Sequence, residues 1–387
     1  MPDYTKDAIR AVDAKFEAQK IVFGPLCFEA VHALLELGIL KIVSDSGGNG
    51  VTAAGAAESA GVSAYGVQVL MEIGLGLGVF RLGPGSAGRG GDAGGERFVL
   101  GKTGWFFLED EMTRVNFDFI NDVCRRGAFE LTRSIRTGKP LGLKQLHAAR
   151  PAEAARPAEA APWKTIYEAL SSLPENIQKS WFAFDHFYSD AGFIEALPLV
   201  FARKRKKILD IGGNTARWAV LCCRYDPDVE VVIVDLPGQT ELAEKNAGAA
   251  GFAGRITAFP CDVLADGAEF PAGADAVWMS QFLDCFSLGE VTSILKKLGK
   301  AAGPETDVYI LEPFWDKQRF EAAAFSLQAV SLYFTCIANG NSKMYRCDEL
   351  VGAVEKAGFV CEDARHGLGA NDYSLLRCRK PGRARGL

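Results

Sequence analysis

The last third of the chain alternates short apolar runs with longer amphipathic stretches. The apolar runs have the length of buried strands, and the amphipathic stretches have the spacing of helices. This alternation is typical of an α/β fold with a doubly wound sheet, in which helices cover both faces. Strands are predicted at 207–211, 230–235, 255–259, 275–279 and 307–312, followed by a final pair around Phe359 and Tyr373–Leu376.

The first hundred residues carry a mainly helical pattern. Apolar residues recur at helical spacing across 8–45, which predicts two amphipathic helices. Thr52 and Ser63 are predicted to cap two further helices, and short strands at 79–82 and 97–100 surround a glycine-rich segment. Helices followed by such a pair of strands form a winged-helix pattern, which serves DNA binding or dimerisation. The small number of arginines near the wing favours dimerisation.

The strongest local signal is a glycine turn between two predicted strands. Gly212 and Gly213 follow an apolar strand, and Asp235 ends the next strand. The glycines let the backbone turn tightly against a ligand, and a helix predicted to begin near Thr215 would direct free amides into the same crevice. A carboxylate about twenty residues after such a turn can bind ribose hydroxyls. These residues therefore predict a nucleoside-bearing cofactor.

The residues of the turn also distinguish between cofactors. The Gly-x-Gly-x-x-Gly spacing of dinucleotide sites is missing. Asp210 stands directly before the turn, where its carboxylate would repel a pyrophosphate but could hold a cationic amino-acid group, directly or through water. This combination favours S-adenosylmethionine over NAD.

Composition limits the class of protein. The net charge of −5 argues against a nucleic-acid partner, and the basic run 203–207 is interpreted as a solvated approach to the first strand. The ten cysteines show no Cys-x-x-Cys spacing, so neither a disulfide framework nor a metal site is expected. We find no signal-peptide core and no apolar run long enough to span a bilayer, and therefore expect a cytoplasmic protein without a membrane partner.

A chain of 387 residues is long enough for more than one domain. We expect a winged-helix dimerisation domain over 1–115, a helical linker and substrate-pocket segment over 116–200, and a cofactor-binding domain over 201–387. Within the linker, the near-repeat at 148–161 is rich in Pro, Ala and Glu and predicts a loose insertion. The aromatic-rich stretch 163–201 is either core or the wall of an aromatic substrate pocket.

Polar residues stand at the carboxyl ends of the predicted strands, where ligands bind in such sheets. They are Asp210, Asp235, Asp262, Ser280–Gln281 and Glu312. Together with the segments 210–213, 234–237, 261–262 and 358–359, they resemble class I S-adenosylmethionine-dependent methyltransferases. The chain is most similar to the dimeric small-molecule O-methyltransferases that carry an N-terminal winged-helix domain, and the resemblance covers nearly its whole length.

The resemblance implies S-adenosylmethionine as cofactor, S-adenosylhomocysteine as product and a homodimer formed through the N-terminal domain. It also implies that Asp235 binds the ribose and that Asp262 and Val263 flank the adenine. The methionine portion would lie against Asp210, Gly212 and Gly213. Further cofactor contacts would come from Asn214, Leu236, Ser280, Gln281 and Ser189, and substrate contacts from Trp181, Asp185, Phe314, Trp315, Asn339 and Lys343.

The chain departs from the family where the catalytic base is expected. The family carries Leu-His-Asp-Trp, but this chain reads Leu-Asp-Cys-Phe at 283–286, so Asp284 takes the histidine position. Glu312 corresponds to the first supporting glutamate, Lys343 replaces the second, and His186 is an alternative base. These changes resemble a bacterial subfamily associated with aryl-polyene and related pigment clusters.

We therefore expect an enzyme that methylates a small phenolic or aryl acceptor, at oxygen or at ring carbon, either free or tethered to a carrier protein. Asp284 would accept a phenol proton or hold a phenolate-like ring, or else serve as a structural helix cap. Two alternatives stay open. One is an S-adenosylmethionine-binding protein without methyl transfer, and the other is a winged-helix regulatory protein.

Overall fold

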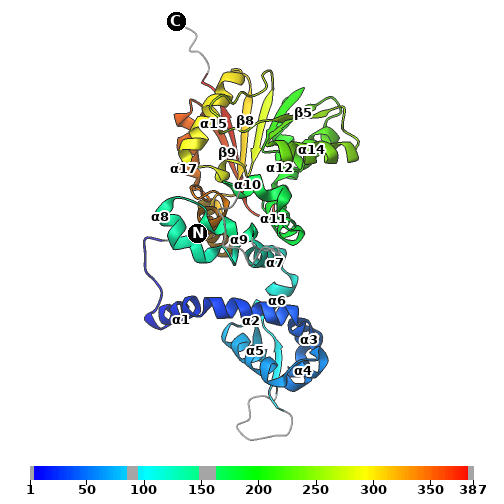
Figure 1. Cartoon of the computed structure of the whole chain (residues 1–387), viewed down its shortest axis with the longest axis vertical. Helices are drawn as coiled ribbons and strands as arrows, with labels where there is room; N and C mark the ends of the chain where they lie inside the picture. The colour runs from blue at the N-terminus through cyan, green and yellow to red at the C-terminus, as the bar shows by residue number, and fades with distance from the viewer. Residues whose placement is uncertain (1–3, 85–94, 148–162, 382–387) are drawn as a thin grey trace. The chain divides into compact units, whose positions relative to one another are not determined.

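The computed structural model describes residues 4–84, 95–147 and 163–381. The predicted insertion at 148–161 and the tip of the glycine-rich segment lie outside these residues. The chain divides into two compact units (Figure 1). The first covers Asp3–Phe117 and the second covers Asp118–Leu387.

The N-terminal unit begins with three helices where two were predicted. The break comes at Gly38, whose φ of 70° lies in the left-handed region and ends the second helix. The capping predictions are confirmed, because the hydroxyls of Thr52 and Ser63 accept hydrogen bonds from the backbone N–H groups of Gly55 and Gly66. The helices are α1 (Ala11–Val22), α2 (Gly24–Glu36), α3 (Ile39–Asp45), α4 (Ala53–Ala60), α5 (Ala64–Gly76) and α6 (Lys102–Glu109), and α7 (Glu111–Phe119) follows them.

A small antiparallel sheet completes this unit. Its strands β1 (Val51–Thr52), β2 (Phe80–Leu82) and β3 (Arg97–Leu100) lie in the order β1-β3-β2. Phe80 and Phe98 are buried between this sheet and the helices α2 to α5. By contrast, α1 buries no residue, and its apolar positions Phe16 and Ile21 are exposed. The winged-helix assignment stays a prediction.

The larger unit is built on a seven-stranded mixed sheet with the order β6-β5-β4-β7-β8-β10-β9. The first five strands in this order are parallel, and β10 and β9 add to the edge in antiparallel pairs. All seven strands were predicted. Their bounds are β4 (Lys207–Ile211), β5 (Glu230–Asp235), β6 (Ile256–Pro260), β7 (Ala276–Ser280), β8 (Asp307–Glu312), β9 (Val360–Leu368) and β10 (Tyr373–Arg379).

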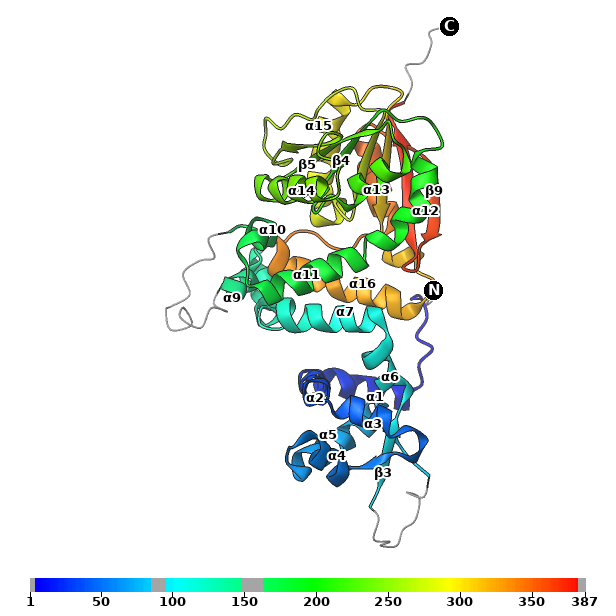
Figure 2. The same cartoon turned by 90° about the vertical axis from the view of Figure 1, so that its right-hand side faces the viewer.

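Helices cover both faces of the sheet, as the alternation of strands and helices predicts (Figures 1 and 2). Alternate strand residues point to opposite faces, so Ile208 packs with α12, α13 and α14 while Leu209 packs with α15 and α17. These helices are α12 (Phe193–Val200), α13 (Arg217–Tyr225), α14 (Pro237–Ala249), α15 (Leu288–Ala301) and α17 (Cys347–Lys356).

A helical layer adjoins the carboxyl ends of the parallel strands. It consists of α8 (Leu131–Thr137), α9 (Lys144–His147), α10 (Ile166–Ala169), α11 (Glu175–Phe187) and α16 (Glu321–Tyr333), in which α11 and α16 run side by side (Figure 2). Among the described residues, Glu321–Ala338 is long and apolar enough to cross a bilayer, and α1 with α2 pass that test only as a pair bent by 68°. Core helices pass the same test, and this one contributes Leu327, Val330 and Ile337 to a buried cluster.

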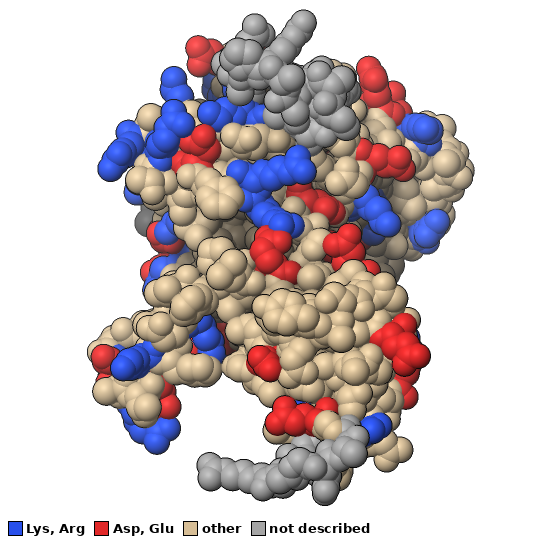
Figure 3. Space-filling model, turned by 60° about the horizontal axis from the view of Figure 1, so that its bottom comes forward, with Lys and Arg blue, Asp and Glu red and all other residues tan. Residues whose placement is uncertain are grey.

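One local prediction is wrong and another is confirmed to within two residues. The helix after the glycine turn, predicted to begin near Thr215, begins at Arg217 after Ala216, which adopts a left-handed conformation with a φ of 68°. The basic run is not fully solvated, because Arg205 is buried, pairs with Asp307 and donates a hydrogen bond to the Val200 carbonyl. On the described surface drawn in Figure 3, Lys and Arg lie among Asp and Glu rather than in one basic face.

Candidate functional site

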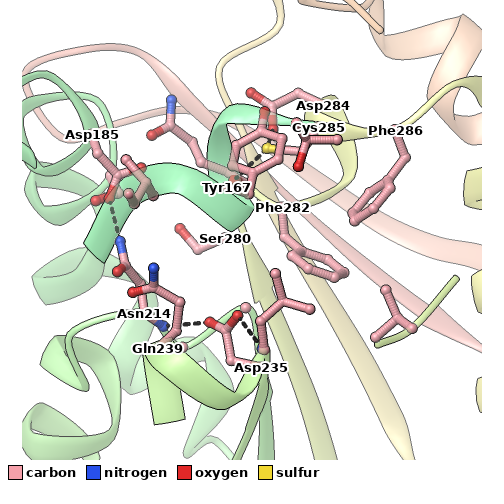
Figure 4. Close-up of a pocket in the computed structure, with 18 of the residues that line it drawn as sticks. Tyr167, Asp185, Asn214, Asp235, Gln239, Ser280, Phe282, Asp284, Cys285 and Phe286 are labelled. Carbon is pink, nitrogen blue, oxygen red and sulfur yellow. Dashed lines mark hydrogen bonds between the residues drawn. The ribbon is translucent and has the colours of Figure 1, made fainter. Parts of the chain in front are cut away.

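A cavity of about 530 Å³ opens at the carboxyl ends of the parallel strands in the larger unit. Its size is that of a small-molecule site. Asn214, Gln239 and Asp235 lie at one end, Tyr167, Asp284 and Cys285 lie at the other, and Ser280 lies between them (Figure 4). We call these the glycine-turn end and the aromatic end.

The glycine turn shapes the first end of the cavity. Gly212 has a φ of 75°, and a Cβ at this position would come within 2.3 Å of the Phe282 ring. A Cβ at Gly213 would lie 2.8 Å from Ile233 and 2.9 Å from the Asp210 carboxylate. Only glycine fits at these two positions, so the backbone comes close enough to the cavity to line it.

Asp235 ends β5 and faces the same turn. Its Oδ2 accepts a hydrogen bond from the Asn214 backbone N–H at 3.0 Å, and its Oδ1 accepts one from Leu236 N–H at 2.7 Å. Each oxygen keeps a further lone pair for a ligand hydroxyl. Burial raises the pKa of Asp235 to about 6, and the two backbone hydrogen bonds partly oppose this effect.

Asp210 and Ser280 bring unpaired polar atoms to the cavity. Both residues line it, and within the described part of the chain the buried Asp210 Oδ2 and Ser280 Oγ atoms have no hydrogen-bond partner. Burial raises the pKa of Asp210 to about 8, and the neighbouring charge of Asp235 adds to the rise. Buried polar atoms normally have partners, so these two atoms indicate a missing polar ligand.

The remaining predicted cofactor residues also line the cavity. Asp262 accepts a hydrogen bond from Leu264 N–H at 2.9 Å, which holds the loop after β6. Gln281 has a φ of 43° and donates its backbone N–H to Leu311, so the chain turns at the end of β7. The others that line the cavity are Leu236, Val263 and Ser189.

Aromatic side chains form the wall of the other end. The Trp181 indole N–H donates a hydrogen bond to the Tyr333 hydroxyl at 2.8 Å, and Tyr333 packs edge-on against Phe119. Tyr167 packs edge-on against Trp181, with ring centroids 6.5 Å apart. The aromatic stretch was predicted to be either core or pocket wall. Trp181 is both, since it is buried and also lines the cavity.

Asp284 lies in a 3-10 helix, Leu283–Cys285, at the aromatic end. Its Oδ1 accepts a hydrogen bond from the Cys285 thiol at 3.5 Å. Burial raises the pKa of Asp284 to about 7, and the charge of Asp185 adds to the rise. A carboxyl group with this pKa can exchange a proton near neutral pH.

Glu312 lies behind Asp284 rather than in the main cavity. Its Oε1 accepts hydrogen bonds from the backbone N–H groups of Phe282 and Leu283 at 3.2 and 3.0 Å, so it holds the 3-10 helix in place. It lines a small enclosed space that Asp284 also borders. Burial, followed by the nearby Asp284, raises the pKa of Glu312 well above its usual range.

His186 and Asp185 line the cavity on α11. Asp185 accepts a hydrogen bond from the Asn214 side chain at 2.9 Å, and burial raises its pKa to about 6. The Nδ1 atom of His186 lies 3.7 Å from Oδ1 of Asp190. His186 and Asp185 thus belong to a charged edge of the cavity.

Three of the six predicted substrate residues do not line the main cavity. Phe314 is buried in the core with α17, and Lys343 pairs with Glu349 at 2.8 Å. Trp315 also stays outside the cavity, with the Arg346 guanidinium over its ring. Asn339 does line it, and its amide donates a hydrogen bond to the Cys285 carbonyl at 2.5 Å.

Some lining residues were not singled out by the sequence. Among them are Phe119, Gln239, Tyr333 and Met344, which come from separate segments, and Tyr167, which belongs to the aromatic-rich stretch 163–201 predicted as core or pocket wall. Gln239 stands in the first turn of α14, directly after the strand that ends at Asp235, and this position could have indicated it. The other four carry no motif. Among the described residues, no group of three or more His, Cys, Asp or Glu side chains could hold a metal ion.

The glycine-turn end fits S-adenosylmethionine. It combines a turn that excludes any Cβ, a buried carboxylate at Asp235 and two unpaired polar atoms at Asp210 and Ser280. Such a group of atoms matches a ligand with ribose hydroxyls and an ammonium group.

Two protein families match the chain. Residues 15–83 match the Dimerisation2-like domain, and residues 195–360 match the O-methyltransferase domain. The second match contains the strands and the glycine turn that form the cavity floor.

Relatives of known activity match parts of the chain. L-tyrosine C(3)-methyltransferase from Streptomyces lavendulae is 24% identical over 61% of this chain and 60% of its own length. The 3-hydroxy-5-methyl-1-naphthoate 3-O-methyltransferase from Streptomyces sahachiroi is 37% identical over 20% of this chain and 22% of its own length. The matched part of the chain thus spans 60% or less of these relatives.

Solved structures match over almost the whole chain. The S-adenosylmethionine-dependent methyltransferase SibL is 21% identical with a TM-score of 0.65, covering 94% of this chain and 98% of its own. The mitomycin 7-O-methyltransferase MmcR is 18% identical with a TM-score of 0.66, covering 96% of this chain and 98% of its own. Both likenesses concern the fold. The two family matches by themselves show a chain that joins a Dimerisation2-like domain to an O-methyltransferase domain.

Proposed function

We propose that the protein is an S-adenosylmethionine-dependent methyltransferase that acts on a small phenolic acceptor. One observation carries the proposal: a single cavity has unpaired polar atoms at its glycine-turn end and aromatic walls around Asp284 at the other end. A donor and an acceptor can therefore lie end to end in the same space. The family matches and the named activities of the relatives support this arrangement.

The residues of the glycine-turn end divide the work of holding the cofactor. Asp235 would accept the ribose hydroxyls, Asp262 and Val263 would flank the adenine, and Asp210 would face the amino-acid portion. When bound, S-adenosylmethionine supplies a methyl group that is electrophilic because it is attached to a sulfonium. The protein therefore mainly orients the acceptor and excludes water.

Asp284 would accept the proton of the acceptor. With a pKa of about 7, its carboxyl is partly ionised at neutral pH, and the aromatic end keeps it from water. Glu312 acts through backbone N–H groups to hold the turn that carries Asp284, and it is therefore a positioning residue. His186, which lies beside Asp190 at the charged edge, remains the alternative base.

The position of methylation is oxygen or ring carbon. The names of the relatives include both outcomes, since one methylates carbon 3 of L-tyrosine and another methylates a naphthoate oxygen. We further propose that the chain works in the cytoplasm as a homodimer formed through its Dimerisation2-like domain, without a membrane or nucleic-acid partner. A bacterial aryl-polyene-type pigment pathway and a carrier-tethered acceptor remain part of the proposal.

Calorimetric titration with S-adenosylhomocysteine tests the cofactor site. The Asp235→Asn variant keeps the size of the side chain but presents an amide, and we expect at least about a tenfold weaker affinity because hydrogen bonds to a charged acceptor are lost. Asp228→Asn is the matched control, since Asp228 is exposed and pairs with Lys204. Absence of binding to the unmodified protein would refute the proposed function.

Transfer of a labelled methyl group separates an enzyme from a protein that only binds the cofactor. Phenolic acceptors would be offered both free and attached to a carrier protein. Binding of S-adenosylhomocysteine without transfer to any of them would support the binding-protein alternative.

A further inference from the structure

The hydroxyl group of Tyr167 is buried. Its oxygen neither donates a hydrogen bond to nor accepts one from an oxygen or nitrogen atom of the described residues, its polar neighbour is the Cys285 thiol, and the residue as a whole is half-buried. The side chain lines the aromatic end of the cavity. A buried hydroxyl without an oxygen or nitrogen partner costs free energy, so its presence at a ligand cavity calls for an explanation.

The ring of Tyr167 is held in place by aromatic neighbours. It packs edge-on against Trp181, and the hydrogen bond from Trp181 to Tyr333 fixes that indole in turn. The packing of the ring therefore places the hydroxyl beside the Cys285 thiol, which directs its own proton to Asp284 and to the Gln281 carbonyl. A rigid donor without an oxygen or nitrogen partner is ready for a ligand.

The surroundings of the hydroxyl define the chemistry that it can serve. Tyr167 lies beside Cys285 and close enough to Asp284 for an electrostatic interaction (Figure 4). Burial raises the pKa of Tyr167 well above its usual range, so the group stays neutral and keeps its proton. The aromatic end thus places a neutral O–H donor near a carboxylate that accepts protons.

We infer that Tyr167 binds the acceptor, with its hydroxyl donating a hydrogen bond to the same phenolic oxygen whose proton goes to Asp284. This inference rests on the proposed function and makes it more specific. A phenolic oxygen offers one proton and two lone pairs. It can therefore donate to Asp284 and accept from Tyr167 at once, which an aryl ring without a hydroxyl cannot do. The cavity then selects acceptors that carry a phenol.

The inference gives Tyr167 an effect on the ionisation of the acceptor. A hydrogen bond donated to a phenolate stabilises the charged form and lowers its pKa. Tyr167→Phe removes only the hydroxyl and keeps the ring that packs against Trp181. The bound phenol should then ionise at a higher pH than in the unmodified protein.

The experiment uses 4-nitrophenol as the probe, because its phenolate absorbs visible light and so reports both binding and ionisation. The probe is titrated into protein saturated with S-adenosylhomocysteine, and the bound spectrum is recorded against pH. For Tyr167→Phe we expect about three- to tenfold weaker binding and a higher pH for ionisation of the bound probe. We also expect an unchanged or higher Tm without ligand, because a buried hydroxyl without an oxygen or nitrogen partner has been removed.

Tyr309→Phe is the matched control. Tyr309 accepts a hydrogen bond from Arg205 at 2.9 Å and lies outside the cavity lining. This variant should lower Tm and leave the binding and ionisation of the probe unchanged, which is the opposite pattern.

The outcomes separate the inference from the proposed function. If 4-nitrophenol binds equally well to the unmodified protein and to Tyr167→Phe, with the same ionisation, Tyr167 only packs and the inference is wrong. If the unmodified protein binds S-adenosylhomocysteine but not the phenol, both the inference and the phenolic acceptor class are wrong, while the cofactor site stands.

Discussion

Replacing Asp210 by Asn should make the protein more stable and weaken its binding of the cofactor product. Asp210 is buried in β4, an interior strand of the sheet, and its Oδ2 has no hydrogen-bond partner among the described residues. Burial raises its pKa from 3.8 to about 8. At pH 7 the unfolded chain has therefore released this proton, whereas the folded protein still holds it.

The size of the stabilisation follows from the difference between the pKa values of Asp210 in the unfolded chain and in the folded protein. A carboxyl with a raised pKa contributes stability below the unfolded pKa and loses it as the pH rises toward the folded pKa. Each pH unit is worth about 1.4 kcal/mol, so ionisation of the unfolded chain lowers stability by about 4 kcal/mol at pH 7. An amide does not titrate, so Asp210→Asn should recover about 2–4 kcal/mol at pH 7.

Urea denaturation followed by tryptophan fluorescence measures this effect. Trp278 is the register partner of Asp210 in the sheet and stacks on Trp218, so its emission reports on this core. The urea concentration at the midpoint of unfolding should decrease for the unmodified protein as the pH rises from about 4 to about 8. Asp210→Asn should make this midpoint less dependent on pH. Asp228→Asn, at an exposed position, should leave it unchanged.

The same variant should bind S-adenosylhomocysteine at least about tenfold more weakly, because a neutral amide replaces an acceptor that can become charged. If the urea midpoint changes equally with pH in the variant and in the unmodified protein, Asp210 titrates normally and the reasoning is refuted. A variant that is stabilised but binds normally would leave the pKa argument intact and exclude Asp210 from the cofactor site.

Three further predictions concern the two ends of the cavity. Affinity for S-adenosylhomocysteine should fall as the pH drops below about 6, where Asp235 gains a proton and can no longer accept both ribose hydroxyls, and calorimetry from pH 5 to pH 8 checks this. Gly213→Ala should abolish measurable binding, since its Cβ would meet Ile233 at 2.8 Å, whereas Gly248→Ala, with no atom within 4 Å, should bind normally. The kcat of methyl transfer should rise with pH through about 7 as Asp284 ionises. If the Asp284→Asn variant keeps this rise in kcat, Asp284 is not the base.

The sheet and the glycine-turn end could be predicted because they depend on local sequence. The parallel strands are apolar runs with polar residues at or near their carboxyl ends, so parallel neighbours such as β4 and β5 bring Asp210 and Asp235 to the same edge of the sheet. The bounds of the five parallel strands differ from the prediction by one residue at most. Helix α1 shows the limit of the same approach, since its amphipathic pattern predicts a buried face but none of its residues is buried by the described residues.

The aromatic end could not be predicted in the same way. Tyr167 and Tyr333 meet there through tertiary packing of α10 and α16, and neither helix carries a motif. Phe314 and Lys343 were placed in the site by the family resemblance. The resemblance gives a position in the sequence but not the direction of the side chain, and here Phe314 packs into the core while Lys343 pairs with Glu349.

The aspartate at position 284 does not have to mean that the base has been lost. Histidine serves as a base in many enzymes because its pKa lies near neutral pH. Burial moves the pKa of Asp284 to about 7, which brings a carboxyl into the range of an imidazole. Glu312 lies on the side of Asp284 away from the cavity, and its own raised pKa keeps it from adding a full negative charge there. The replacement therefore keeps a group that can exchange a proton near neutral pH while changing its size and its hydrogen-bonding geometry, which agrees with an acceptor whose oxygen is also held by Tyr167.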